Sequence, residues 1–354
     1  MKAISVDKLQ PGMELARTVV NDDMVVILSE NTLLTKAHIT RLGFLNIPSV
    51  YIKDEYELSP NYQSVMALFN RGNAFASEYK EVLRKVNSII EATAQTGKIP
   101  VDKSKNLVHS SLAPMSKQSG VIDYLYELNH MADDLYNHSM RVAILTGVIG
   151  KWLYKKPSEI NDLILAGFLH DIGKTKFPDR LQSRRVETLK GEDFERYMQH
   201  TIDGSHLINE DPKLADGIKL AALQHHEYMD GSGFPFGTKG EEIHEYARII
   251  AIADLYDNIT TEREGFVRQT PFDAIAKITE DMYSKLDPTI SVTILKRIKD
   301  AFLGSKVMLS NGLEGTIVNY PNDFAQHPLV RIDQENVVDL NQHKDIKIIE
   351  YNQK

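Results

Sequence analysis

The sequence contains no cysteine among its 354 residues. Disulfide bonds and thiolate metal sites are therefore excluded, so any bound metal must be held by nitrogen and oxygen atoms. Basic residues are also in deficit, because 41 Lys and Arg stand against 49 Asp and Glu, a formal net charge of -8. This balance argues against a protein that coats polymeric nucleic acid, whose phosphates require an excess of cations. A small anionic ligand needs only a local basic patch.

Long apolar runs are missing as well. No stretch of about 18 uncharged apolar residues could span a membrane, and Met1–Asp7 lacks the apolar core of a signal peptide. We therefore expect a soluble, cytoplasmic protein without a membrane span. With 42% hydrophobic residues, the chain is long enough for a large core and for two or three domains.

Histidine and aspartate, in contrast, recur inside apolar helical patterns. His170 and Asp171 close the apolar run 163–169, where a histidine and a carboxylate are costly unless they are paired, protonated or bound to a metal. Further candidates of the same kind are His138, His200, His225, His226 and Asp254. One His-Asp pair alone is more often a structural hydrogen bond. The whole set suits Zn, Fe, Mn or Ni, which accept imidazole and carboxylate ligands.

Several of these residues belong to motifs that follow one another in a recognisable order. They are His170-Asp171-Ile172-Gly173-Lys174, His225-His226-Glu227, Asp230-Gly231-Ser232-Gly233-Phe234-Pro235 and Ile252-Ala253-Asp254-Leu255-Tyr256-Asp257. Over roughly half its length the chain resembles the HD-GYP family, a branch of the HD phosphohydrolases that cleaves cyclic di-GMP. One position departs from the family pattern, because the tyrosine of the family name is Phe234 here.

The resemblance implies a centre with two divalent metals. One metal would be bound by His138, His170, Asp171 and Asp254, and the other by Asp171, His200, His225 and His226, so that Asp171 bridges them. Iron or manganese is the family habit, while the ligand chemistry leaves zinc and nickel open. Some members hold a third metal through a glutamate at the position of Asp134. The shorter aspartate should bind it weakly or not at all, which would favour accumulation of a linear dinucleotide product.

The implied reaction is hydrolysis of cyclic di-GMP to the linear dinucleotide, and onward to GMP, by a hydroxide that bridges the metals. Lys174 would stabilise the phosphate oxygens, and nucleotide contacts would come from Gly233, Phe234, Pro235 and Arg263. Each of these has a structural alternative: a solvated lysine, a stiff connecting loop and a helix-surface arginine. The alternative for the whole protein is a catalytically weak member that binds the cyclic dinucleotide or a partner protein.

The pattern of periodicities predicts a mainly α protein. A small β-rich module is expected at 1–57, a helical linker at 58–118, an all-helical HD-type bundle at 119–303 and a β-barrel-like tail at 304–354. Long helices are predicted over 64–94, where pairing with a second chain would give a homodimer, and over 121–154, which would place Asp134 and His138 on one face. Ser158 is expected to cap the next helix.

Overall fold

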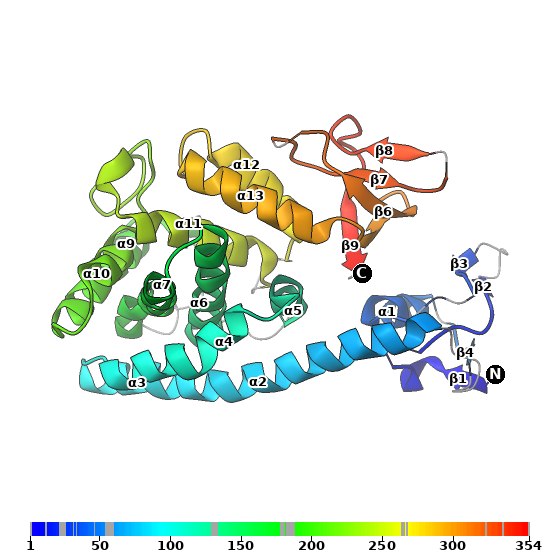
Figure 1. Ribbon diagram of the computed structural model, residues 1–354, viewed down its shortest axis with the longest axis horizontal. Coiled ribbons are helices and arrows are strands. Elements are labelled where there is room, and N and C mark those ends of the chain that lie inside the picture. The colour runs from blue at the N-terminus through cyan, green and yellow to red at the C-terminus, as the bar shows by residue number, and fades with distance from the viewer. Residues whose placement is uncertain are drawn as a thin grey trace. The chain divides into compact units, whose positions relative to one another are not determined.

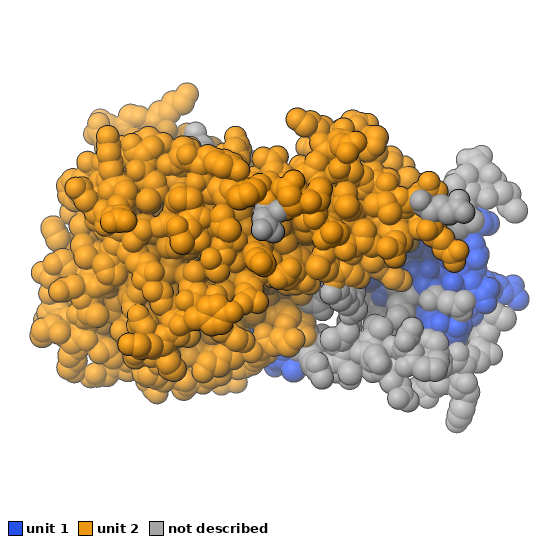
Figure 2. All heavy atoms as spheres, turned by 45° about the horizontal axis from the view of Figure 1, so that its top comes forward, with its two compact units in different colours: residues 1–77 blue, residues 78–354 orange. Residues whose placement is uncertain are grey.

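The computed structural model describes residues 2–352 apart from residues 11–12, 21–25, 31, 33, 46, 54–59, 129–133, 178–180, 182–187, 263–265, 267, 323 and 335 (Figure 1). The chain divides into two compact units, residues 1–77 and 78–354 (Figure 2). This division falls inside one long helix, α2 (Pro60–Thr96), where the sequence predicts a helix over 64–94. The four-part division expected from the sequence stays a prediction.

The first unit is built from short strands around one helix. β1 (Lys2–Ser5) pairs with β4 (Ser49–Ile52), and β2 (Val19–Val20) pairs with β3 (Val26–Leu28), both antiparallel. A 3-10 turn η1 (Val6–Lys8) follows β1, and α1 (Lys36–Phe44) begins after Thr35, whose hydroxyl accepts from His38 N. The fully buried side chains of Leu15, Leu34 and Leu42 lie in its core. The β-rich N-terminal part is confirmed.

The second unit is mainly helical, which confirms the predicted class. Its elements are α3 (Val101–Leu107), the π-helical turn η3 (Val108–Leu112), α4 (Ala113–Ser116), α5 (Val121–Leu128), α6 (Leu135–Trp152), α7 (Pro157–Leu169), η4 (Ile172–Lys176), α9 (Glu192–Asn209), α10 (Asp216–Gln224), η6 (Gly240–Glu242), α11 (Glu245–Thr260), α12 (Pro271–Asp281) and α13 (Pro288–Phe302). Helix α6 is central, because all its residues from Asn137 to Gly150 are buried. It packs against α4, α7, α11 and α13.

Two predicted helix boundaries are wrong. The predicted helix 121–154 is not continuous, because Asp134 has extended backbone angles and caps the N-terminus of α6. Its carboxylate accepts from Asn137 N at 2.7 Å, so Asp134 precedes the helix that carries His138 instead of lying within it. Likewise, α7 begins at Pro157 rather than after Ser158. Proline is favoured at the first helical position because it needs no N–H partner there.

The C-terminal part is a five-stranded antiparallel sheet in the order β8-β7-β6-β5-β9. Its strands are β5 (Lys306–Leu309), β6 (Glu314–Asn319), β7 (Leu329–Arg331), β8 (Val337–Asp339) and β9 (Ile348–Asn352). An Asn311-Gly312 turn joins β5 to β6, and Gly312 has a positive φ of 84°. The sheet is tied to the helices through β9, where Tyr351 contacts the rings of Tyr126, Phe272 and Phe302.

Close contact between backbones positions the segment after α7. A Cβ atom on Gly173 would lie 2.0 Å from the carbonyl oxygen of His200 and 2.7 Å from the nitrogen of Gly204. Gly173 is not among the described glycines with a positive φ, so this contact, rather than the backbone conformation, requires a glycine. Consequently η4 lies directly on α9, next to His200. No helix in the described part of the chain is long and apolar enough to cross a membrane.

We expect Gly173→Ala to lower the free energy of unfolding by about 1–3 kcal/mol, since the added methyl group meets backbone that has no room to yield. Gly204→Ala should cost less, because its Cβ would lie 3.3 Å from the nitrogen of Gly173. Gly43→Ala is the control, with no atom within 4 Å. The measurement is urea denaturation in the presence of a chelator. Equal midpoints for Gly173→Ala and Gly43→Ala would contradict the packing argument.

Candidate metal centre

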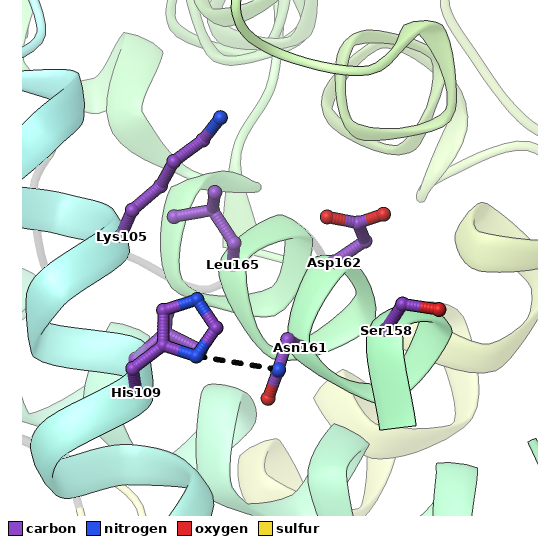
Figure 3. A pocket seen from close by; sticks show the side chains of 7 residues that line it. Lys105, His109, Ser158, Asn161, Asp162 and Leu165 are labelled. Atoms are coloured by element: carbon purple, nitrogen blue, oxygen red, sulfur yellow. Dashed lines mark hydrogen bonds between the residues drawn. The ribbon is translucent and has the colours of Figure 1, made fainter. Parts of the chain in front are cut away.

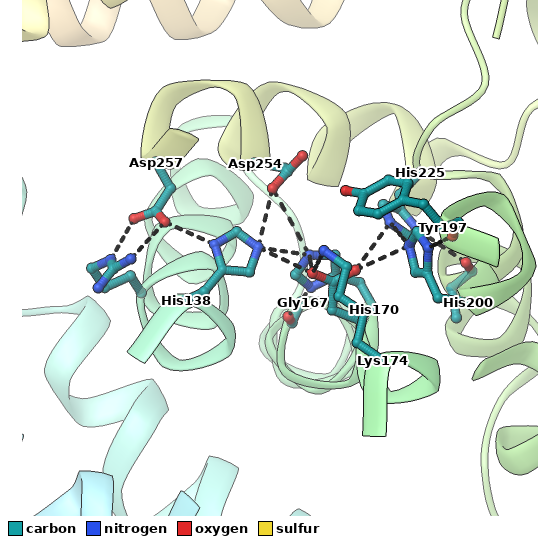
Figure 4. A network of polar contacts seen from close by, with 12 residues as sticks. His138, Gly167, His170, Lys174, Tyr197, His200, His225, Asp254 and Asp257 are labelled. Atoms are coloured by element: carbon teal, nitrogen blue, oxygen red, sulfur yellow. Dashed lines mark hydrogen bonds and ion pairs between the residues drawn. The ribbon is translucent and has the colours of Figure 1, made fainter. Parts of the chain in front are cut away.

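Five segments of the second unit bring histidines and aspartates together. His138 comes from α6, His170 and Asp171 directly follow α7, His200 lies on α9, His225 and His226 directly follow α10, and Asp254 lies on α11. Figure 4 shows the network that runs from Asp257 through His138 and His170 to His200 and His225. Because α10 ends at Gln224, the two adjacent histidines lie at the C-terminal end of this helix, and their ring centroids are 4.2 Å apart.

Asp171 lies between two histidine pairs. Its Oδ2 is 3.4 Å from Nε2 of His138 and 3.6 Å from Nε2 of His170. Its Oδ1 is 3.1 Å from Nε2 of His200 and 3.6 Å from Nε2 of His225. The two oxygens of one carboxylate thus face different pairs of imidazole nitrogens.

Two further predicted ligands lie at the edges of this arrangement. Oδ1 of Asp254 is 3.2 Å from Nε2 of His138 and 4.0 Å from Nε2 of His170, on the side of the first pair. His226 joins Asp171, His200 and His225 in a group whose candidate ligand atoms all lie within 4.8 Å of one another. The structure therefore places all seven of these predicted ligands in one buried cluster.

The outer nitrogens of the histidines are held by fixed acceptors. Nδ1 of His170 donates to Gly167 O at 2.8 Å, Nδ1 of His225 donates to Ala222 O at 3.0 Å, and Nδ1 of His200 donates to Tyr197 O. A carbonyl oxygen only accepts, so in the neutral ring the proton is on Nδ1 and the lone pair of Nε2 points inward. This is the tautomer that a metal-binding histidine requires.

The inward-facing atoms fit divalent cations. Nε2 of His138 and Nε2 of His170 are 3.3 Å apart, and so are Nε2 of His200 and Nε2 of His225. Two unprotonated nitrogens at that distance repel each other unless a proton or a cation lies between them. In the described part of the chain, Asp171 Oδ1 and His226 Nε2 are also buried without a hydrogen-bond partner. Nitrogen and oxygen donors in this arrangement suit Fe, Mn, Zn or Ni.

Burial and neighbouring charges shift the pKa values of these groups in opposite directions. Burial lowers the pKa of His170 to about 3 and that of His200 to about 4, and it lowers the pKa of His226 well below 6.5. Burial also acts on His138, but the hydrogen-bonded carboxylates of Asp171, Asp254 and Asp257 outweigh it and raise its pKa. The carboxylates around His138 thus favour a positive charge there, which either a proton or a metal ion supplies.

Lys174 lies against the same carboxylate. Its Nζ is 2.5 Å from Oδ2 of Asp171 and 4.9 Å from the ring centroid of Tyr197. Burial lowers the pKa of Lys174, but the charge of Asp171 raises it by more. The pKa is therefore raised overall, and the amine stays protonated. The lysine is only 8% exposed and is therefore not the solvated helix-end residue of the alternative interpretation.

The loop after His226 is packed against its own backbone. A Cβ on Gly233 would lie 2.4 Å from the carbonyl oxygen of His226, and N of Phe234 donates to that oxygen. The ring of Phe234 lies 4.6 Å from the ring of His226 and 5.9 Å from that of Phe194, whereas Phe236 is 67% exposed. The nucleotide contacts expected from Gly233, Phe234 and Pro235 stay predictions, and the freely accessible ring of this loop is that of Phe236.

Other predicted residues lie elsewhere. Oδ1 of Asp134 accepts from both nitrogens of Asn137, and Asp134 belongs to neither histidine group found among the described residues. Arg263 lies outside the described residues.

The sequence reasoning did not identify Asp257 and Arg141 as part of the site. Nδ1 of His138 donates to Asp257 Oδ2 at 2.9 Å, and the guanidinium of Arg141 binds both oxygens of Asp257, at 2.7 and 3.0 Å. Arg141 follows His138 by three residues and Asp257 follows Asp254 by three, so each lies one helical turn beyond a predicted ligand. That spacing is the signal in the sequence that could have identified them.

A separate pocket of about 220 Å³ lies between the α3–η3 segment and α7 (Figure 3). Its lining consists of Lys105, Val108, His109, Ser158, Asn161, Asp162 and Leu165. Nδ2 of Asn161 donates to Nδ1 of His109 at 3.3 Å. None of these residues belongs to the histidine cluster, so the pocket is distinct from the candidate metal centre.

Comparison with known proteins agrees with this architecture. The sequence profile of the HD domain matches residues 125–290, the segment that contains the His-Asp cluster. The structure of Bd1817, an HDG"Y"P protein from Bdellovibrio bacteriovorus, is similar with a TM-score of 0.53 at 16% identity, over 84% of this chain and 99% of that chain. This likeness concerns the fold.

Two relatives are similar in sequence. The chain is 26% identical over 229 residues to the cyclic di-GMP phosphodiesterase PA4108 of Pseudomonas aeruginosa, which covers 65% of this chain and 55% of the relative. It is 32% identical over 184 residues to a cyclic di-GMP phosphodiesterase of Thermotoga maritima, which covers 51% and 49%. The chain thus spans about half the length of these relatives. The HD-domain match over residues 125–290 agrees with the resemblance to the HD-GYP family seen in the sequence.

In the metal-free protein, we expect stability to fall as the pH is lowered from 6.5 to about 4. The pKa values of His170 and His200, about 3 and 4 when folded, lie below their ordinary value of 6.5, so the unfolded chain binds protons that the folded chain does not. Each such proton costs about 1.4 kcal/mol per pH unit. The raised pKa of His138 does not oppose this fall, because its contribution is fully present below 6.5.

Denaturant unfolding in a chelator at several pH values measures this dependence. His200→Gln should reduce the slope by about one proton, because the glutamine does not titrate. A wild-type stability that stays constant between pH 6.5 and 4 would contradict the assignment of buried, neutral imidazoles.

Proposed function

We propose that this protein is a metal-dependent phosphodiesterase that hydrolyses cyclic di-GMP to the linear dinucleotide and then to GMP. The observation that carries this proposal is the carboxylate of Asp171, whose two oxygens face two separate pairs of histidine Nε2 atoms. The names of the two relatives support the substrate, and the order of motifs supports the reaction class.

The residues that would hold the metals divide into two sets with one shared member. His138, His170, Asp171 and Asp254 would hold one cation, and Asp171, His200, His225 and His226 the other, with iron or manganese preferred. When bound, two such cations supply an activated water and neutralise charge on a phosphoryl group. The protein fixes the direction of four of the five imidazoles, those of His138, His170, His200 and His225, through their Nδ1 hydrogen bonds, so these donor atoms need no reorganisation.

Lys174 would bind the non-bridging oxygens of the phosphate. Its ammonium is held at Asp171 and against the ring of Tyr197, in a site where water is largely excluded. A buried, permanently charged donor that is already oriented stabilises developing negative charge more than a solvated one does. The exposed ring of Phe236, whose N donates to Glu227 Oε1 at 2.8 Å, offers a flat apolar surface on which a guanine base could stack.

The direct test is anaerobic purification of the full chain with metal analysis, followed by incubation with cyclic di-GMP and chromatography of the products. Parallel incubation with cyclic di-AMP tests the choice of base. Release of the linear dinucleotide or GMP supports the proposal. A protein that carries two metals and binds cyclic di-GMP, but releases no product, would refute the catalytic assignment and support the alternative of a nucleotide-binding module.

We expect Asp171→Asn to reduce the metal content and abolish hydrolysis, because the amide cannot provide two anionic donor oxygens, one to each histidine pair. Asp203→Asn is the matched control, since Asp203 lies on α9 and pairs with the surface cations Lys176 and Arg196. Metal per chain and turnover are measured on both variants. Full turnover by metal-depleted Asp171→Asn protein would rule out the two-metal assignment.

A separate prediction concerns Lys174. Lys174→Met should lower kcat by about 100-fold, the usual cost of removing one oriented charged donor. The metal content should be retained, because the substitution removes a cation that competes for Oδ2 of Asp171. Lys176→Met is the control on the same turn, where the side chain is 44% exposed and pairs with Asp203. If Lys174→Met lost its metals, or turned over normally, the lysine would not have this role.

A further inference from the structure

A chain of buried polar groups connects helix α2 to His138. Tyr79 on α2, Arg141 on α6 and Asp257 on α11 are each at most 1% exposed. Burying a guanidinium, a carboxylate and a phenol is costly, and a buried ion pair by itself is weak grounds for stability. A role in orienting a neighbouring group is a better explanation for polar residues retained at such a place.

The link between Arg141 and His138 is geometrically rigid. Arg141 donates from Nε to Asp257 Oδ1 at 2.7 Å and from Nη2 to Asp257 Oδ2 at 3.0 Å, which prevents the carboxylate from rotating. Oδ2 of Asp257 in turn accepts from Nδ1 of His138 at 2.9 Å. The direction of Nε2 of His138, toward Asp171 and Asp254, therefore depends on where Arg141 holds Asp257.

Tyr79 brings α2 into the same network. Its hydroxyl donates to Asn137 Oδ1 at 3.2 Å, on the turn of α6 that carries His138. The phenol also lies close to Arg141: burial raises the pKa of Tyr79, and the neighbouring guanidinium opposes that rise. Asn137 is held from its other side by Oδ1 of Asp134 at 3.0 Å. Tyr79 thus contacts the side chain of Asn137, the residue before His138, and lies close to the guanidinium that holds Asp257.

We propose that Tyr79, Arg141 and Asp257 are positioning residues that orient the ring of His138 for metal binding. The affinity of the metal position that includes His138 therefore depends on α2. This inference rests on the metal-binding part of the proposed function. It adds residues that touch neither the metal nor the substrate. It also assigns a role to α2, the helix that continues into this unit from the N-terminal unit at Glu78.

The test is a titration of the full-length, metal-stripped protein with Mn²⁺, in which free Mn²⁺ is followed by electron paramagnetic resonance. We expect two binding events in the wild type. Asp257→Asn should weaken one of them by about 10–100-fold, the usual cost of losing an outer partner of a histidine ligand. Tyr79→Phe should weaken the same event severalfold. Tyr320→Phe is the matched control, because it removes a buried hydroxyl that has no hydrogen-bond partner among the described residues.

A double-variant cycle separates a relay from general damage to the fold. If Tyr79 acts through Arg141 and Asp257, then Tyr79→Phe should have little further effect in the Asp257→Asn background. Additive effects, or a Tyr79→Phe protein that binds Mn²⁺ as the Tyr320→Phe protein does, would overturn the inference. Arg141→Lys, which keeps the charge and loses the two-point contact, replaces Asp257→Asn in the cycle if that variant does not fold.

The proposed reaction can fail separately from this inference. Two Mn²⁺ sites with the expected coupling, in a protein without phosphodiesterase activity, would support the relay and refute the reaction. Absence of Mn²⁺ binding by the wild type would overturn both.

Discussion

The centre depends on one electrostatic constraint, the need to compensate the buried carboxylate of Asp171. This side chain is 1% exposed and lies among four imidazole nitrogens whose lone pairs point inward. Lys174 supplies one positive charge from one side. The imidazole nitrogens and the carboxylate oxygens lie at distances near those of hydrogen bonds but have no protons to share. Positive charge therefore stabilises this site. The surrounding helices place nitrogen and oxygen donors around this carboxylate in an arrangement compatible with divalent cations.

The outer contacts of the histidines explain how a helical scaffold achieves such accuracy. Three rings are anchored to main-chain carbonyls within four residues of themselves, so local helix geometry sets their direction. His138 differs, because its anchor is the side chain of Asp257, which in turn depends on Arg141. One half of the centre is therefore governed by local backbone, and the other by packing between α6 and α11. Packing between helices adjusts more readily than local backbone geometry. The orientation of His138 is therefore the most open to influence from elsewhere in the fold.

Close packing between helices also fixes the positions of the site residues. Gly173 lies against the backbone of His200 and Gly204, which brings Asp171 on one segment to His200 on the next without intervening side chains. Gly167 similarly admits α6, because a Cβ there would lie 2.6 Å from the hydroxyl of Thr146. Helices that approach so closely leave little freedom for the ligands they carry. The accuracy of the site thus comes from backbone contact as much as from polar contact.

By itself, the sequence determined the class of fold, most helix positions and the seven residues now found in one cluster, because apolar periodicity and ligand chemistry are local properties. It misjudged the helix around Asp134, because an aspartate can cap a helix or lie within one with the same neighbours. Only the tertiary structure decided that Asp257 holds His138 and that Tyr79 reaches Asn137, across 119 and 58 residues of chain. Contacts at such separations are selected by packing between helices, and one-dimensional periodicity carries no record of them.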